Sequence, residues 1–239
     1  MRLEPKTIEE VQDQSRRELG KAARRSRIVR AARDLIRETG STELSMRMIA
    51  KSAGVSLTTP YNLFGSKWAV VLAVFEDERD FAARFAKLSA PNALERIFDA
   101  HALAMSYFIN DPAFYRTLWR ALLNTQGGDT TGLATPERLK RNKDAWRSLI
   151  EQAQAEGLLE RWVSPDALEQ ALSCFANGAM LSWAMGALKT QDLLPSTSLG
   201  YALTLRGAAT IAGARLLEPR IEHYQDGLKR PRRRGRHSA

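Results

Sequence analysis

The sequence contains a single cysteine. An internal disulfide is therefore excluded, and the composition is typical of proteins from a reducing compartment. Cys174 lies in an apolar stretch, where we expect a small buried side chain rather than a redox sensor. The N-terminus, MRLEPKTIEE, lacks the apolar core of a signal peptide. We therefore expect a cytoplasmic location.

Runs that alternate apolar with polar residues, the pattern of a β-strand, are also missing. The apolar residues recur at helical spacing instead, so we predict an all-α fold. The segment 170–188 has 19 residues and no charge, so it is long enough for a transmembrane helix. Serine, asparagine and glycine dilute it, so we expect a helix that packs closely on other helices, and no membrane partner.

The residue groups that enzymes need are absent as well. We find no pair of nucleophile and base, no metal-ligand cluster and no cofactor loop. The GGDTTG segment lacks the Gly-Lys-Ser/Thr ending of a phosphate-binding loop, and no strand precedes it. His101 has no persuasive set of metal-ligating neighbours, and we expect it in the core or at the edge of a pocket. The sequence therefore predicts a protein that is not an enzyme and that holds neither a metal nor a cofactor.

Charge is abundant but unevenly distributed along the 239 residues, which carry a net charge of +9. Residues 1–67 contain 14 Lys or Arg and 8 Asp or Glu, a net charge of +6. Residues 68–217 have a net charge of −1, and residues 218–239 have +4. A basic excess confined to the two ends predicts a nucleic-acid partner.

The stretch LSMRMIAKSAGVSLTTPYNLFGSK, residues 44–67, predicts two short helices joined by a tight turn and followed by a third helix. Serines stand where helices need N-caps, and glycines stand where helices end in a left-handed residue. These serines and glycines are Ser45, Ser56, Ser66, Gly54 and Gly65. Such closely spaced caps predict a compact helix-turn-helix.

Apolar residues complete this arrangement. Met48, Ile49 and Ala53 would form the apolar face of the first helix, and Phe64 would face the core. Pro60 lies about four residues after the predicted cap, where it removes only the first intrahelical bond.

The second helix, 57–64, would lie in the DNA major groove. Its hydroxyl, amide and phenol side chains can contact base edges, thymine methyls and phosphates. Its N-terminus adds free N–H groups that suit a phosphate. The residues that we expect to contact DNA are Ser45, Arg47, Ser56, Leu57, Thr58, Thr59, Tyr61, Asn62 and Lys67.

Residues 24 to about 70 resemble the DNA-binding domain of TetR-family transcriptional regulators. Two positions depart from the family pattern, namely Leu63, often polar or aromatic, and Pro60, usually bulky and apolar. The matching features are an amphipathic helix from Arg24 to Thr39 that ends at Gly40, Leu44-Ser45, Ile49-Ala50, the Ala53-Gly54-Val55-Ser56 turn, Tyr61-x-x-Phe64, and Ser66-Lys67.

The resemblance implies a two-fold dimer. Helices over about 165–191 and 196–217 carry small residues at helical spacing, and those of two subunits would form a four-helix bundle. It also implies a small-molecule effector inside the helical body, which would move a helix over 67–88 and change the spacing of the two DNA-binding heads. The aromatic-rich candidates for the effector pocket are Phe81, Phe85, Phe98, His101, Tyr107, Phe108, Tyr115, Trp119, Trp146, Phe175 and Trp183.

The predicted organisation has four parts. A charged extension over 1–23, which frays or lengthens the first helix, precedes a three-helix helix-turn-helix domain over 24–70. A larger helical domain for effector binding and dimerisation follows over 71–217. The last part, 218–239, is a basic tail, either disordered and solvated or an arm that binds DNA nonspecifically.

Together these observations predict a homodimeric transcriptional repressor that a small apolar or aromatic effector releases from a palindromic operator. The alternative is an architectural protein of the nucleoid that binds DNA through the same head and tail without a ligand. An internal cavity would favour the first interpretation.

Overall fold

The computed structural model describes residues 8–77, 81–123 and 136–229, and no β-strand occurs among them. The all-α prediction is therefore confirmed. Contacts divide the chain into two compact units, Met1–Arg79 and Asp80–Ala239, which we call the head and the body. Of the helices described, none is long and apolar enough to cross a membrane.

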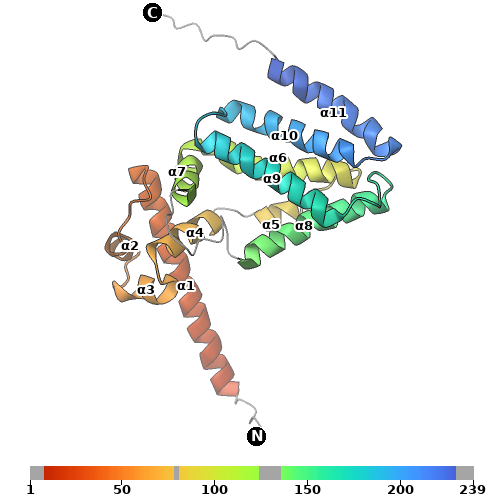
Figure 1. Ribbon diagram of the computed structural model, residues 1–239. Helices are drawn as coiled ribbons and strands as arrows, with labels where there is room; N and C mark the ends of the chain where they lie inside the picture. Colours follow the sequence, from red (N-terminus) through yellow and green to blue (C-terminus); the bar gives the residue numbers. More distant parts are fainter. Residues whose placement is uncertain (1–7, 78–80, 124–135, 230–239) are drawn as a thin grey trace, which may run out of the picture. The chain divides into compact units, whose positions relative to one another are not determined.

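Helix α1 forms the frame of the head, and α2, α3 and α4 all pack against it (Figure 1). Apolar side chains from α1, α2 and α4 fill the space between them, with Ile28, Ile49 and Val70 fully buried. The bounds of these helices are α1 (Ile8–Thr39), α2 (Met46–Ser52), α3 (Thr58–Phe64) and α4 (Lys67–Asp77).

Two details of the head bear on the sequence prediction. Helix α1 begins at Ile8, so residues 8–23 of the charged extension lengthen the first helix, which is one of the two predicted alternatives. In α2 the buried face is formed by Met46, Ile49 and Ala50, whereas Met48 is 42% exposed. The prediction for Met48 is wrong because helical spacing from Met46 leads to Ile49 and Ala50 and turns Met48 toward solvent.

In the body, α10 packs against α6, α9 and α11, and α8 packs against α6 and α9. The core lies between these helices, and its largest buried side chains include Leu94, Ile150 and Leu205. The bounds are α5 (Phe81–Phe85), α6 (Ala93–Asn110), α7 (Pro112–Leu123), α8 (Pro136–Ala155), α9 (Pro165–Ala184), α10 (Thr190–Gly207) and α11 (Ile211–Lys229).

Several predicted bounds from residue 67 onward differ from the structure. Helix α9 ends at Ala184, not near 191, because Gly186 adopts a positive φ of 84°. The region predicted as one helix over 67–88 contains α4 and α5, and α5 ends at Phe85. The predicted domain boundary at residue 70 falls inside α4, which packs with the head.

A tertiary contact explains why the last predicted helix is two helices. The backbone N–H of Glu160 donates to the Ala208 carbonyl at 2.9 Å, and the N–H of Thr210 donates to the Leu158 carbonyl at 3.1 Å. These bonds hold residues 208–210 in a bridge with the α8–α9 turn, and the Thr210 hydroxyl then caps α11 by accepting from the N–H of Gly213.

Helix α11 also corrects the prediction of a tail over 218–239, because residues 218–229 are helical. Arg220 pairs through two nitrogens with the Glu95 carboxylate of α6, and its guanidinium lies 4.5 Å from the centre of the Phe98 ring. Residues 230–239 lie outside the described residues, as does the predicted loop over 125–135.

Candidate DNA-binding and effector sites

The turn between α2 and α3 has the predicted construction. The Ser45 hydroxyl accepts the N–H of Met48 at 3.1 Å and so caps α2. Gly54 has a φ of 62° and directs the chain out of the helix, and the N–H of Val55 then bonds to the Ala50 carbonyl at 3.0 Å. A side chain with a Cβ would strain the backbone at Gly54.

The start of α3 differs from the prediction. Leu57 is the N-cap residue, and it makes no side-chain cap bond. The Ser56 hydroxyl lies instead 3.0 and 2.8 Å from the hydroxyls of Thr58 and Thr59. Pro60 is consequently the third residue of α3 and is buried, and its missing N–H is one that no helix satisfies internally at this position.

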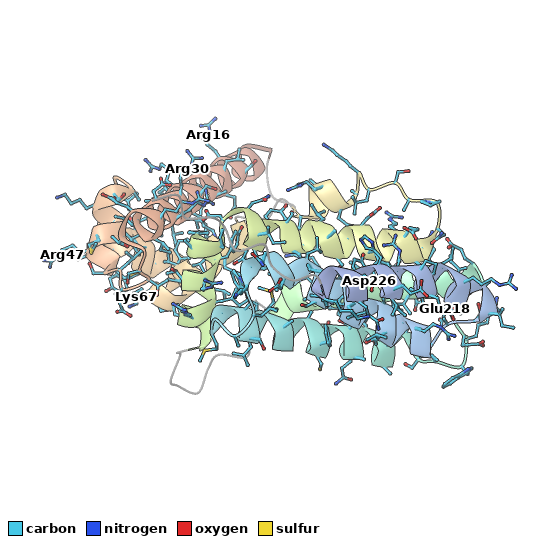
Figure 2. The ribbon with its side chains drawn as sticks, turned by 90° about the horizontal axis from the view of Figure 1, so that it is seen from above. Arg16, Arg30, Arg47, Lys67, Glu218 and Asp226 are labelled. Carbon is cyan, nitrogen blue, oxygen red and sulfur yellow. The ribbon has the colours of Figure 1, made fainter. Side chains whose placement is uncertain are left out.

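Most of the predicted DNA-contacting side chains are exposed on the head. Tyr61 is 51% exposed and Leu57 is 43% exposed, although both are large. Thr59 and Lys67 are half-buried, and the Lys67 amine lies 3.5 Å from the Glu43 carboxylate. The exposed residues are Ser45, Arg47, Ser56, Leu57, Thr58, Tyr61 and Asn62. Figure 2 shows Arg47 projecting from the head into solvent.

Sequence reasoning missed Arg25, which fixes the end of α3 to α1. Its guanidinium donates to the Leu63 carbonyl at 3.1 Å and lies over the Phe64 ring at 4.2 Å from the centre. One cation thus satisfies a carbonyl in the last turn of α3 and stacks on the adjacent aromatic face. Arg25 is one of many arginines in α1, so no local pattern distinguishes it.

The predicted effector residues of the body divide into groups. The first surrounds Trp183, which is fully buried. Its ring and the Tyr115 ring both meet Phe108 edge to face, at 5.9 and 5.1 Å. The indole N–H of Trp183 donates to the Thr190 hydroxyl at 3.0 Å, and the Arg116 guanidinium lies 4.9 Å from the Trp183 ring centre.

The second group surrounds His101, whose ring stacks on Tyr201 at 4.1 Å while Trp146 meets Tyr201 at 6.0 Å. The Thr197 hydroxyl donates to the Leu193 carbonyl at 2.7 Å and lies 2.8 Å from Nε2 of His101, so Nε2 is the protonated donor. Burial lowers the pKa of His101 to about 4, and the ring is neutral at pH 7. Burial, assisted by the charge of Glu169, raises the pKa of Tyr201.

The remaining candidates are dispersed. Phe81 and Phe85 stack on each other at 5.6 Å. Phe98 meets Tyr224 of α11 at 6.5 Å. Tyr107 lies under the Arg84 guanidinium at 5.2 Å, and Trp119 is buried.

Phe175 lies outside these groups and is 41% exposed. Its ring fills the space beside Gly200 of α10, where an added Cβ would come within 2.0 Å of ring carbons. It therefore packs α9 against α10. Cys174, next to it, is exposed, and the prediction of a buried filler is wrong because α9 buries its Leu168 and Leu172 face instead.

The body also holds polar residues that the sequence did not single out. Thr190, Thr197 and Tyr201 complete the two aromatic groups, and Glu169 is buried with its carboxylate 2.6 Å from the Ser173 hydroxyl. Their common signal is a polar residue inside an apolar helical stretch. That signal identifies a buried hydrogen bond but not its partner.

This geometry defines a helix-turn-helix protein with a helical body. Residues 28–74 match the model of a family described as bacterial regulatory proteins, tetR family. The head therefore carries the DNA-binding domain of the TetR family of transcriptional regulators. A search of curated proteins found no match.

Solved structures show the same fold. TylP, a TetR regulator from Streptomyces fradiae, is 23% identical with a TM-score of 0.60, and the match covers 87% of this chain and 99% of TylP. A TetR transcription regulator from Haloarcula marismortui is 16% identical with a TM-score of 0.60, over 79% of this chain and all of the other. SmeT in complex with triclosan is 19% identical with a TM-score of 0.59, over 80% and 94%.

Proposed function

We propose that this protein is a homodimeric repressor that binds a palindromic operator and is released by a small apolar or aromatic effector. The observation that carries the proposal is the exposed polar surface of α3, where Thr58, Tyr61 and Asn62 make no contribution to the core. A regulator of this kind acts where bacterial DNA is, in the cytoplasm.

On DNA, α3 enters the major groove and these side chains contact base edges. Ser45, Arg47 and Lys67 flank α3 and bind phosphates, which set the register of the head on the duplex. A single head reads few base pairs. Two heads on half-sites about 34–36 Å apart read enough for a specific operator.

The exposed face of α9 supports the dimer. Its residues follow one another at steps of three and four, the spacing of a helix-packing seam. The apolar members are large for a solvent-exposed surface, with Leu181 at 44% and Met185 at 69%. The seam comprises Ala171, Cys174, Gly178, Leu181 and Met185. On α10, the second predicted dimer helix, Leu203 is likewise a large apolar residue that is 51% exposed.

For the effector, the group around Trp183 is the candidate that the contacts favour. It combines aromatic faces from Phe108 and Tyr115 with two polar groups, Thr190 and the Arg116 guanidinium. An apolar or aromatic ligand with one acceptor matches the chemistry of these groups. It would release DNA only through a higher affinity for the form that does not bind the operator. The similar SmeT structure is a complex with triclosan, and this likeness supports the chemical class.

The alternative, a ligand-independent architectural protein, uses the same head and draws its affinity from charge. It predicts little discrimination between sequences and no response to aromatic ligands.

Selection from random-sequence DNA with the full-length protein tests both. We expect a palindromic site that binds at least about 10³-fold more tightly than a shuffled duplex at physiological salt. A panel of aromatic ligands should then contain compounds that lower this affinity. Enrichment of no site would contradict the repressor and favour the architectural protein.

A further inference from the structure

The middle of α1 presents a run of exposed residues, of which Arg25 contacts α3. The residues from Ser15 to Arg27 are exposed, apart from the half-buried Gly20, and Ile28 is the first buried one among the described side chains. We call residues 15–27 the α1 overhang. At a rise of 1.5 Å per residue the overhang is roughly 20 Å long, and it precedes the matched family segment, which begins at residue 28.

The overhang is strongly basic, with six Lys or Arg and Glu18 as its one acid. Lys21 stands three and four residues from Arg24 and Arg25, and like charges at these spacings destabilise a helix. Among the described residues, the ion pairs do not include Arg16, Lys21, Arg24 or Arg27. A polyanion that accepts these cations would therefore relieve a repulsion that no ion pair among the described residues compensates.

Arg25 places the overhang at the recognition helix. Through its contacts with Leu63 and Phe64 it joins α1 to the C-terminal turn of α3, and from that point the overhang continues past α3 (Figure 1). Figure 2 shows Arg16 and Arg30 projecting outward from α1. A duplex that holds α3 in its groove consequently has its backbone near the overhang.

We propose that the α1 overhang is a second DNA-binding surface, which binds the phosphate backbone beside the base pairs that α3 contacts. Arg16, Lys21, Arg24 and Arg27 supply the contacts, and Arg25 is the positioning residue. The inference rests on the proposed function, because it needs α3 on DNA. The surface lengthens the footprint and raises affinity for any sequence, since phosphates carry no base identity.

A membrane surface is the less suitable partner. Leu19 is the one large apolar side chain among the described residues of the overhang. A helix that binds in a lipid interface needs a continuous apolar face opposite its charges.

The test compares two full-length variants that lose the same charge. The overhang variant carries Arg16→Gln, Lys21→Gln, Arg24→Gln and Arg27→Gln, and glutamine keeps the helix propensity. The control variant carries substitutions at exposed residues of the body, Lys140→Gln, Arg141→Gln, Arg161→Gln and Arg215→Gln. The probes are the duplex selected by the wild type, extended by about one helical turn (about 10 bp) on each side, and a shuffled duplex of equal length.

Dissociation constants are measured over a salt series. We expect the slope of log K against log[salt] to fall by about 0.9 for each lost phosphate contact, and by about 2 or more in total. The preference for the selected duplex should stay within about 3-fold of wild type, since the lost contacts are to phosphates. The control variant should keep the wild-type slope.

An unchanged slope in the overhang variant, or an equal fall in both variants, would overturn the inference. Binding of the wild type to anionic vesicles, lost in the overhang variant without a change on DNA, would overturn it in favour of a membrane partner. A wild type without sequence preference would instead contradict the proposed function. The slopes on the shuffled duplex would still decide whether the overhang binds DNA.

Discussion

The head and the body present their candidate residues in opposite ways. In the head, they lie within 45–67 and are mostly exposed, because other residues, such as Ile49 and Pro60, occupy the buried positions of α2 and α3. In the body, the candidates come from five helices, α5 to α9, and the majority are buried against one another. A surface site built from contiguous residues can thus be read from sequence, whereas a site between helices depends on packing that only the fold determines.

The largest effect expected within this comparison concerns Tyr61 on α3. Tyr61→Ala should reduce the preference for the selected operator by about 10²-fold or more, because each of two subunits loses a base contact worth roughly 1–3 kcal/mol. Met48→Ala, an exposed change on α2, is the control and should leave the preference intact. Competition titrations with selected and shuffled duplexes measure both. Equal preference in Tyr61→Ala and wild type would remove α3 from the role of recognition helix.

The seam on α9 provides the second prediction. Leu181→Glu should weaken the dimer by roughly 10²-fold or more, because the new carboxylate would be buried without a partner. Trp162→Glu changes a residue that is 79% exposed elsewhere in the body, and it should leave the dimer intact. Analytical ultracentrifugation of the wild type and of both variants would show whether each is a monomer or a dimer.

Cys174 offers a second measurement of the same dimer, since it is the chain's one cysteine. A thiol reagent should label it slowly in the wild type and rapidly in Leu181→Glu. Rapid labelling in the wild type would argue against a dimer through α9.

The buried His101 makes the stability of the body depend on pH. Its pKa falls from 6.5 in the unfolded chain to about 4 in the fold. As pH decreases below about 6.5 the unfolded state takes up the proton first, so stability is complete above that pH and declines down to about 4.

His101→Gln keeps a donor for Thr197 but removes the titration. Between pH 7 and 4 the wild type should lose about 3 kcal/mol of unfolding free energy more than the variant. Urea unfolding of the wild type and of His101→Gln at several pH values between 7 and 4 would measure this difference in unfolding free energy. Parallel pH profiles would show that His101 is not buried as a neutral ring.

The smallest effects concern two glycines of the body. A Cβ at Gly213 would lie 2.0 Å from the Leu158 carbonyl oxygen, whereas a Cβ at Gly207 meets nothing within 4 Å. Gly213→Ala should therefore destabilise the protein by about 1–3 kcal/mol, and Gly207→Ala should stabilise it by up to about 1 kcal/mol. Thermal unfolding of the two variants would show opposite signs, and a common sign would contradict the close approach at Gly213.

Local chemistry made the helix-turn-helix predictable. Ser45, Gly54, Gly65 and Ser66 act on backbone within four residues of themselves, so their effects need no knowledge of the rest of the chain. The DNA contacts assigned to this region remain a prediction. Arg25 could not be found in this way, because its partner is 38 residues distant.

The errors in the body have a tertiary origin. Gly200 and Gly213 are among the small residues of 196–217 that the sequence pattern assigns to the dimer interface. In the structure they lie instead against residues of the same chain, Phe175 and Leu158. Similarly, the last helix was predicted to begin near residue 196, whereas α10 begins at Thr190 and contains Pro195. The break at 208–210 arises from hydrogen bonds to the α8–α9 turn.

Helix α11 determines where the C-terminus of this protein can be truncated or fused to another sequence. A chain shortened at Leu217, the end of the predicted domain, would lose Arg220 and Tyr224 and leave Glu95 without its cation and Phe98 without its cover. Affinity tags, reporter fusions and truncations designed for crystallisation should therefore begin after Lys229. Residues 218–229, predicted from the sequence to be part of a tail, form a helix that packs on the body. A protein shortened before them would lack part of its folded domain.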